Sequence, residues 1–224
     1  MNHRFRRLLL LLVLPFLTTA CFDIEEELSL KRNGSGEYRI TLDMTRAAEM
    51  MKGFMTAEQL AESDMFDSMD SSIQAQAANL RSVEGISNVR HQSDGYRYTL
   101  AYDFASVEAL NTASASGLGM GEMEPISSSG TSYALSGKTF ERIAADVSGM
   151  FDNMDEEQQE AMQMARMMMA DANYKIIYHM PGKVRKMTNE SATLTDGKKT
   201  VVLDAGFLDI LDGKVLMGNK VVFK

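Results

Sequence analysis

Short runs in which apolar and polar residues alternate, joined by glycine-containing turns, occur along most of this chain. The first two runs span residues 24–30 and 38–44 and are separated by Asn33-Gly34-Ser35-Gly36. Alternation with a period of two is typical of a strand with one buried face, and a glycine-rich turn between two such runs predicts a β-hairpin. The chain is therefore restricted to folds that contain antiparallel sheet.

A second hairpin is predicted over residues 86–104, with its turn at Ser93-Asp94-Gly95. Its return strand contains Tyr96-Arg97-Tyr98-Thr99-Leu100, which matches Tyr38-Arg39-Ile40-Thr41-Leu42 in the first hairpin. A turn precedes each matching strand and a helix follows it. Two sequences could converge on good strand residues, but we favour a duplicated ββα unit.

Apolar residues spaced three and four apart predict helices between the hairpins. The expected helical segments are 47–55, parts of 57–82, 107–112 and a methionine-rich stretch near 154–171. The last fifty residues favour strands, at 174–180, 192–194, 201–203, 215–217 and 221–223, with a turn or short helix at 208–211.

The expected fold class is α+β, with antiparallel hairpins forming a sheet that packs against Met-rich helices. We divide the chain into a leader (1–20), a ββα repeat region (21–113), a Gly- and Ser-rich flexible loop (114–130) and a last region (131–224). The last region combines a hairpin at 133–140, the Met-rich helix and the C-terminal strands. Together these parts are expected to form one compact domain.

The leader has the three-part order of a secretory signal. Arg4, Arg6 and Arg7 precede an apolar run from Leu8 to Leu17, and small residues follow up to Ala20 and the chain's single cysteine, Cys21. The apolar run is about ten residues, roughly half of what a membrane-spanning helix needs. A cysteine at the cleavage point makes the leader resemble that of bacterial lipoproteins.

That resemblance implies cleavage between Ala20 and Cys21 and acylation of Cys21, which becomes the first residue of the mature chain. Two or three acyl chains hold a protein on a bilayer far more firmly than one. Lipoproteins with Asp after the cysteine tend to stay in the inner membrane, and here Phe22 follows. The resemblance thus implies a cell-envelope protein, on the outer membrane if the host is Gram-negative.

A second resemblance covers residues 174–204. A strand leads to Pro181-Gly182-Lys183-Val184, and a polar stretch, Asp196-Gly197 and a valine-rich strand follow. This order is similar to LppM-like lipoprotein domains. It implies a sheet-rich envelope domain without an established activity.

Charge is distributed unevenly along the chain. Without the leader arginines, 20 basic side chains face 31 acidic ones, whereas residues 174–224 alone carry nine basic and five acidic side chains. The acidic balance excludes nucleic acid as a partner. The basic segment either complements the rest of the fold or forms a face for lipid or glycolipid phosphates, and we favour complementarity.

The 19 methionines permit three interpretations: core packing, an apolar ligand surface, or a soft-metal site. Thioethers suit Cu(I) and Ag(I), and Met162, Met164, Met167 and Met168 are the candidate ligands. Charged residues on one side of the same helix favour packing instead. No cofactor is expected.

Candidates for catalysis are few. His179 lies at a strand end before Pro181-Gly182, where a solvated histidine is expected. The acidic run Glu25–Glu27 is interpreted as a solvated strand face, and none of the common nucleophile or phosphate-binding motifs occurs. We therefore expect a non-enzymatic lipoprotein, attached to the membrane by its acyl chains, that binds an envelope protein or an apolar or lipid ligand. A soft-metal binding protein is the alternative.

Overall fold

The structure is a computed structural model of the chain, and it describes residues 22–53, 55–56, 65–116, 131–144, 163, 166 and 169–224. The strands are β1 (Asp23–Leu30), β2 (Gly36–Asp43), β3 (Ile86–Asp94), β4 (Arg97–Phe104), β5 (Ser132–Ser136), β6 (Thr139–Ile143), β7 (Asn173–His179), β8 (Val184–Met187), β9 (Thr193–Thr195), β10 (Thr200–Gly206) and β11 (Asn219–Phe223). The helices are α2 (Thr45–Lys52), α4 (Met65–Leu80), α5 (Val107–Ala115), α8 (Phe207–Leu211) and the 3₁₀ turn η3 (Asp196–Lys198). The expected α+β class is confirmed.

All four predicted hairpins are present, as β1–β2, β3–β4, β5–β6 and β9–β10. The predicted strand at 215–217 is wrong, because β11 begins only at Asn219. The backbone N–H groups of Lys214 and Val215 both donate to the carbonyl of Asp209 in α8, which turns this segment away from a strand ladder. The predicted helix at 47–55 ends earlier, at Lys52.

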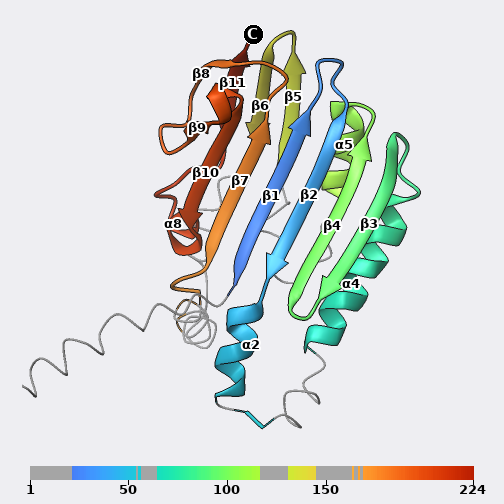
Figure 1. Cartoon of the computed structure of the whole chain (residues 1–224), viewed down its shortest axis with the longest axis vertical. Coiled ribbons are helices and arrows are strands. Elements are labelled where there is room, and N and C mark those ends of the chain that lie inside the picture. Colours follow the sequence, from blue (N-terminus) through green and yellow to red (C-terminus); the bar gives the residue numbers. More distant parts are fainter. Residues whose placement is uncertain are drawn as a thin grey trace, which may run out of the picture.

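The strands form two sheets (Figure 1). The larger has seven strands in the order β3-β4-β2-β1-β7-β10-β9, and the smaller has four in the order β5-β6-β11-β8. All neighbours are antiparallel except β1 and β7, which run parallel with Asp23 beside Asn173 and Ser29 beside His179. The hairpin pattern did not predict this parallel pair, because residues 31–172 separate the two strands in the chain.

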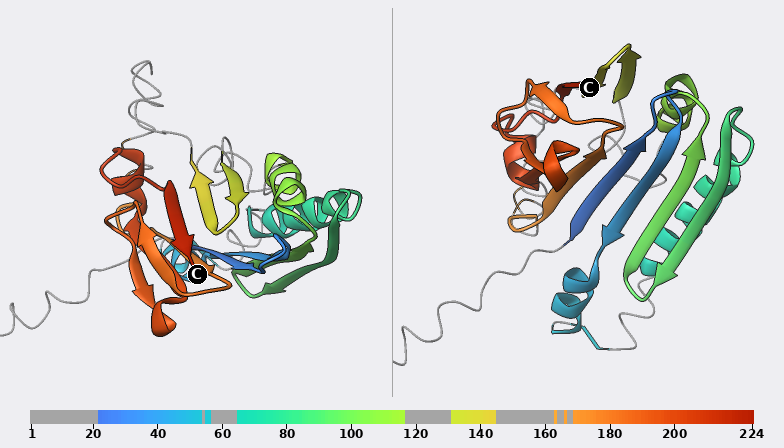
Figure 2. Two further views of the ribbon diagram at one scale, coloured as in Figure 1. Left: turned by 90° about the horizontal axis from the view of Figure 1, so that it is seen from above. Right: turned by 45° about the horizontal axis from the view of Figure 1, so that its top comes forward.

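Within the described part of the chain, the large sheet is covered on one side only (Figure 2). Helices α4 and α5 and the small sheet lie on that side, and the opposite side, called the outer face from here on, carries no described helix. Side chains of β1 and β7 are buried at every second position, as one-sided coverage requires. None of the described helices has the length and apolar character needed to cross a bilayer.

The two matching hairpins are related by an approximate two-fold axis. The matched threonines, Thr41 and Thr99, are direct cross-strand partners, with their Oγ1 atoms 3.2 Å apart. Ile40 pairs with Leu100 and Leu42 with Tyr98, one step on either side of the threonines. A duplicated hairpin that pairs with its own copy produces this register, so the structure favours duplication over convergence.

The interior leaves no room for a side chain at Gly36. A Cβ atom there would lie 2.1 Å from the carbonyl oxygen of Ser29 and 2.4 Å from the ring of Phe104. Both neighbours are fixed, since Ser29 belongs to the paired strand β1 and Phe104 is only 2% exposed. The absence of a side chain at Gly36 therefore lets the Phe104 ring lie over β2.

We predict that Gly36→Ala destabilises the protein by at least about 2 kcal/mol, because backbone and ring must move apart in a packed core. Gly95→Ala is the control: Gly95 has a φ of 61° but open space around it, so only the strain of about 1 kcal/mol applies. Urea unfolding measures both. A Gly36→Ala variant no less stable than Gly95→Ala would contradict the packing described here.

Candidate functional site

Most of the residues singled out by sequence lie outside the described part of the chain. This holds for Ala20 and Cys21 at the cleavage point and for the four candidate metal ligands, Met162, Met164, Met167 and Met168. Among the residues that the structure does describe, no three His, Cys, Asp or Glu side chains come together in a way that could hold a metal ion. Of the candidates discussed above, the structure places Glu25–Glu27 and His179.

Glu26 forms the centre of a buried polar cluster between the two sheets. Its Oε2 atom lies 3.1 Å from Arg142 Nη2 and accepts a hydrogen bond of 3.0 Å from the Tyr174 hydroxyl. Its Oε1 atom accepts a hydrogen bond of 2.7 Å from the Tyr133 hydroxyl. We call these four residues the Glu26 cluster. None of them is more than 4% exposed.

The interpretation of Glu25–Glu27 as a solvated strand face is wrong for Glu26. Alternation along β1 points Glu26 to the same side as Ile24 and Leu28, toward the small sheet. The signal in the sequence was an acidic residue at an apolar position of an otherwise regular pattern. Its partners could not be identified from sequence, because Arg142 and Tyr133 belong to another sheet.

Two further contacts hold the cluster from the side of the small sheet. The Asn111 side chain in α5 receives a hydrogen bond of 2.7 Å from the Tyr133 N–H and donates one of 2.9 Å to the Tyr133 carbonyl. Arg142 Nη1 donates to the Met217 carbonyl at 3.2 Å. Helix α5 and the segment before β11 thereby fix where Tyr133 and Arg142 meet Glu26.

The cluster shifts the ionisation of its members strongly. Burial raises the pKa of Tyr133 and Tyr174, and the Glu26 carboxylate beside them raises each pKa further. Burial is the largest single influence on the pKa of Arg142 and lowers it, but the Glu26 carboxylate together with the surrounding tyrosine oxygens outweighs burial and holds that pKa well above its usual range. The guanidinium thus stays charged and the two phenols stay neutral hydrogen-bond donors.

Two buried polar atoms at the edge of the cluster, Arg142 Nε and the Tyr178 hydroxyl, make no well-formed hydrogen bond within the described residues, although the Arg142 guanidinium interacts with the Tyr178 hydroxyl. Tyr178 also packs edge-on against Phe140 of the small sheet, with ring centroids 5.5 Å apart. Because all four residues of the Glu26 cluster are almost completely buried, the cluster is closed to solvent. It links the two sheets and offers no access to a substrate.

A second polar network lies on the outer face. His179 Nε2 is 2.8 Å from Glu27 Oε1, and His179 Nδ1 is 3.2 Å from Thr200 Oγ1. The expected solvated histidine is therefore a hydrogen-bonded one, with its side chain 40% exposed. Glu27, His179 and Thr200 lie on three adjacent strands, β1, β7 and β10, so the order of the sheet produces this chain of contacts.

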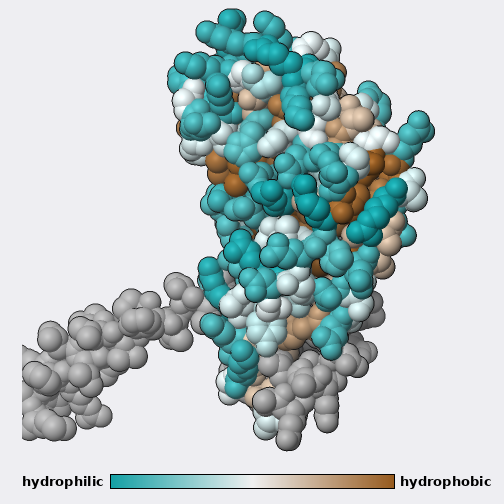
Figure 3. All heavy atoms as spheres, turned by 45° about the vertical axis from the view of Figure 1, so that its right-hand side comes forward, coloured by the Kyte–Doolittle hydropathy of each residue, from teal (hydrophilic) through white to brown (hydrophobic). Residues whose placement is uncertain are grey.

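The network continues across the sheet through alternating charges. Arg39 pairs with Glu27 at 2.7 Å and with Glu37 at 3.1 Å, and Arg90 reaches Glu37 at 2.8 Å. A small pocket of about 70 Å³ lies here, lined by Glu27, Ser29, Glu37 and Arg39. In Figure 3, where the right-hand side of Figure 1 is turned forward, the visible surface is predominantly hydrophilic. These exposed pairs contribute little stability each.

The end of the molecule farthest from Asp23 is strongly basic, and we call it the basic end. Its nine exposed cations are Lys31, Arg32, Lys138, Lys183, Arg185, Lys186, Lys198, Lys199 and Lys224. None of them forms an ion pair among the described residues. Backbone hydrogen bonds from Phe223 to Lys138 and from Lys224 to Lys183 bring separate turns together here. Glu190 and Asp196 are acidic side chains in the neighbouring loops.

No protein-family model matches this sequence, and no curated protein matches it. Among solved structures, the chain is similar to the folded domain of LppM from Mycobacterium tuberculosis, determined by NMR. The TM-score is 0.42 with 9% sequence identity, and the match covers 94% of each chain.

We predict that Arg142→Met costs about 3–5 kcal/mol of stability, because it leaves the Glu26 carboxylate buried without its cation. The double variant with Glu26→Gln should cost clearly less than the sum of the two single variants. Arg46→Met is the control, since the Arg46–Asp23 pair is exposed and its loss should cost under about 1 kcal/mol. Urea unfolding of the four variants and the wild type would show additive costs if Glu26 and Arg142 did not interact.

A second prediction concerns alkaline pH. Because the folded state holds the pKa of Tyr133 and Tyr174 above 10, the unfolded chain loses these protons first as the pH rises. The contribution of these tyrosines to the free energy of unfolding is therefore fully present below pH 10. Above pH 10 it falls by up to about 1.4 kcal/mol per pH unit for each tyrosine. Urea unfolding between pH 8 and 11 measures the slope. Tyr133→Phe should reduce it, and an unchanged slope would be the opposing result.

Proposed function

We propose that this protein is a non-enzymatic lipoprotein of the bacterial cell envelope, attached through acylated Cys21, whose folded domain is held at the bilayer surface to bind a partner. The support comes from the sequence of the leader and from the place where the fold begins. Phe22, the residue after Cys21, is already part of the core: it is 7% exposed and packs edge-on against Phe207 with ring centroids 5.2 Å apart.

This contact is the observation that carries the proposal. β1 starts at Asp23, so one residue separates the anchoring cysteine from the folded domain. One residue spans at most about 3.6 Å. A domain attached in this way cannot move far from the lipid headgroups, in contrast to lipoproteins that sit on a long linker.

The chemistry of the described part supports a binding role over catalysis. Glu27, His179 and Thr200 follow the order of a hydrolytic triad, but Thr200, which would have to supply the nucleophile, is only 5% exposed. The Glu26 cluster is closed in the same way.

The basic end supports a partner that carries negative charge. It lies at the opposite end of the strands from Asp23, roughly 26 Å away for an eight-residue strand. Its cations form no ion pair in the described part of the fold. Internal charge complementarity, the interpretation favoured from the sequence, holds for Lys175 and Lys220, which pair with Glu25 and Glu141, but not for the basic end. An upright domain would present this end away from the bilayer, where an acidic envelope protein could reach it.

The anchor is tested by Cys21→Ser. Wild-type protein should incorporate labelled palmitate and stay with membranes through an alkaline carbonate wash, whereas the variant should take up no label. Expressed behind a standard cleavable leader, the variant should appear in the soluble fraction, because no acyl chain remains to hold it.

Thr18→Leu is the matched control, since lipoprotein leaders usually carry Leu three residues before the cysteine. It should be labelled and membrane-bound like the wild type. Wild-type protein that takes up no palmitate would rule out the anchor.

A further inference from the structure

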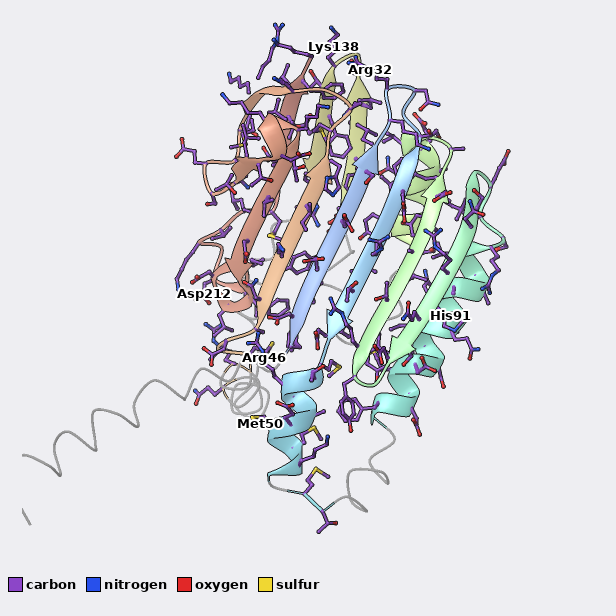
Figure 4. The ribbon with its side chains drawn as sticks, viewed as in Figure 1. Arg32, Arg46, Met50, His91, Lys138 and Asp212 are labelled. Carbon is purple, nitrogen blue, oxygen red and sulfur yellow. The ribbon has the colours of Figure 1, made fainter. Side chains whose placement is uncertain are left out.

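The end of the domain next to the anchor differs in character from the outer face and from the basic end. Asp23, at the start of β1, pairs with Asp43, the last residue of β2, and α2 begins two residues later. Arg46 of α2 contacts Asp23 at 3.1 Å. Helix α2 therefore starts beside Asp23, two residues after Cys21, and Figure 4 shows Arg46 and Met50 at this end and Lys138 and Arg32 at the other.

Helix α2 is less packed than its counterpart in the second repeat. α5 packs against β3, β4 and β5, whereas α2 makes at most peripheral contacts with other described elements and projects beyond the sheet in Figure 1. Ala47 and Ala48 are buried at its base. Farther along, Met51 is only partly buried, and so is Met55, whose N–H donates to the Met51 carbonyl at 2.8 Å.

An aromatic pair lies at the same end of the domain. Tyr96, in the β3–β4 turn, contacts Phe66 of α4 with ring centroids 4.5 Å apart, and both residues are partly buried against the edge of the core. Lys52 of α2 lies over the Tyr96 ring, with Nζ 5.0 Å from its centroid, which connects the helix to the turn. We call Met51, Met55, Phe66 and Tyr96 the anchor-end rim.

We infer that the anchor-end rim is a second contact with the bilayer, made by the protein itself. Thioether and aromatic side chains at the end of a domain suit the boundary between headgroups and acyl chains, where tyrosine is enriched. This inference rests on the proposed acyl anchor, because the one-residue connection at Phe22 is what brings the rim to the membrane. α2 then lies at headgroup level, and the strands lead away from the bilayer toward the basic end.

Charge is not what holds the rim there. Three cations, Arg46, Lys52 and Arg97, are exposed at this end. Arg46 pairs with Asp23 and Arg97 with Asp43, and the acidic Glu49 is exposed on α2 beside Lys52. Contact with lipid should therefore depend on apolar area and persist in high salt. This separates the rim from the basic end, whose attraction to any anionic surface would be screened by salt.

The chain contains no tryptophan, so a single introduced one reports on its own surroundings. Met51→Trp places it in the rim, and Arg32→Trp places a control at the basic end. Both acylated full-length variants are reconstituted in vesicles of phosphatidylcholine and phosphatidylglycerol, and sedimentation with the vesicles is measured in the same samples. The Met51→Trp emission should shift to shorter wavelength and be quenched by lipids brominated in the acyl chain, while the Arg32→Trp emission should do neither.

The outcomes separate the two proposals. If the protein sediments with the vesicles but the Met51→Trp emission is that of tryptophan in water, or equals that of Arg32→Trp, the proposed anchor stands and the rim contact is overturned. If the protein does not sediment with the vesicles, both the proposed anchor and the rim contact are overturned. As a second readout, Met51→Glu in the Cys21→Ser protein, expressed behind a cleavable leader, should weaken partition into the same vesicles about tenfold. An unchanged partition would again overturn the rim contact.

Discussion

The contact between Glu26 and Arg142 joins the two sheets of this protein, and much of its architecture depends on it. A buried carboxylate is costly unless a cation and hydrogen-bond donors surround it, and here the donors come from both sheets: Tyr174 from the large one, Tyr133 and Arg142 from the small one. The cluster therefore specifies how β5 and β6 sit over β1 and β7. Apolar contacts such as Phe140 against Tyr178 add packing across the same interface but would tolerate more than one alignment.

This arrangement gives the molecule a direction. β1 starts two residues after the proposed lipid attachment at Cys21 and ends at a turn that belongs to the basic end, so the two ends of one strand have opposite roles. The outer face between them is covered by cross-strand ion pairs and by the Glu27–His179–Thr200 chain, which keep it hydrated. The molecule thus has three surfaces: the anchor-end rim near the proposed anchor, the outer face with its paired charges, and the basic end with its unpaired cations.

Local chemistry explains which parts of this fold could be predicted from the sequence. Period-two alternation and turn glycines lie within a few residues of each other, so the hairpins were predictable. The match of Tyr38–Leu42 with Tyr96–Leu100 predicted a duplicated unit, but not that Thr41 pairs with Thr99. The parallel pairing of β1 with β7 and the division into two sheets depend on contacts between distant residues. The same is true of Glu26, whose acidic side chain appeared as an interruption of the β1 pattern until Arg142, Tyr133 and Tyr174 were placed around it. His179 was misjudged for the same reason, since Glu27 and Thr200 reach it from separate strands.

If the Glu26 cluster makes the two sheets one cooperative unit, native-state hydrogen exchange tests this most directly. Amides in β1 and β7 of the large sheet and in β6 and β11 of the small sheet should exchange only through global unfolding, with the same free energy and the same dependence on denaturant. Amides of β6 and β11 that exchange at a distinctly lower free energy than those of β1 and β7 would show that the small sheet opens by itself. That result would contradict the role assigned here to Glu26 and Arg142.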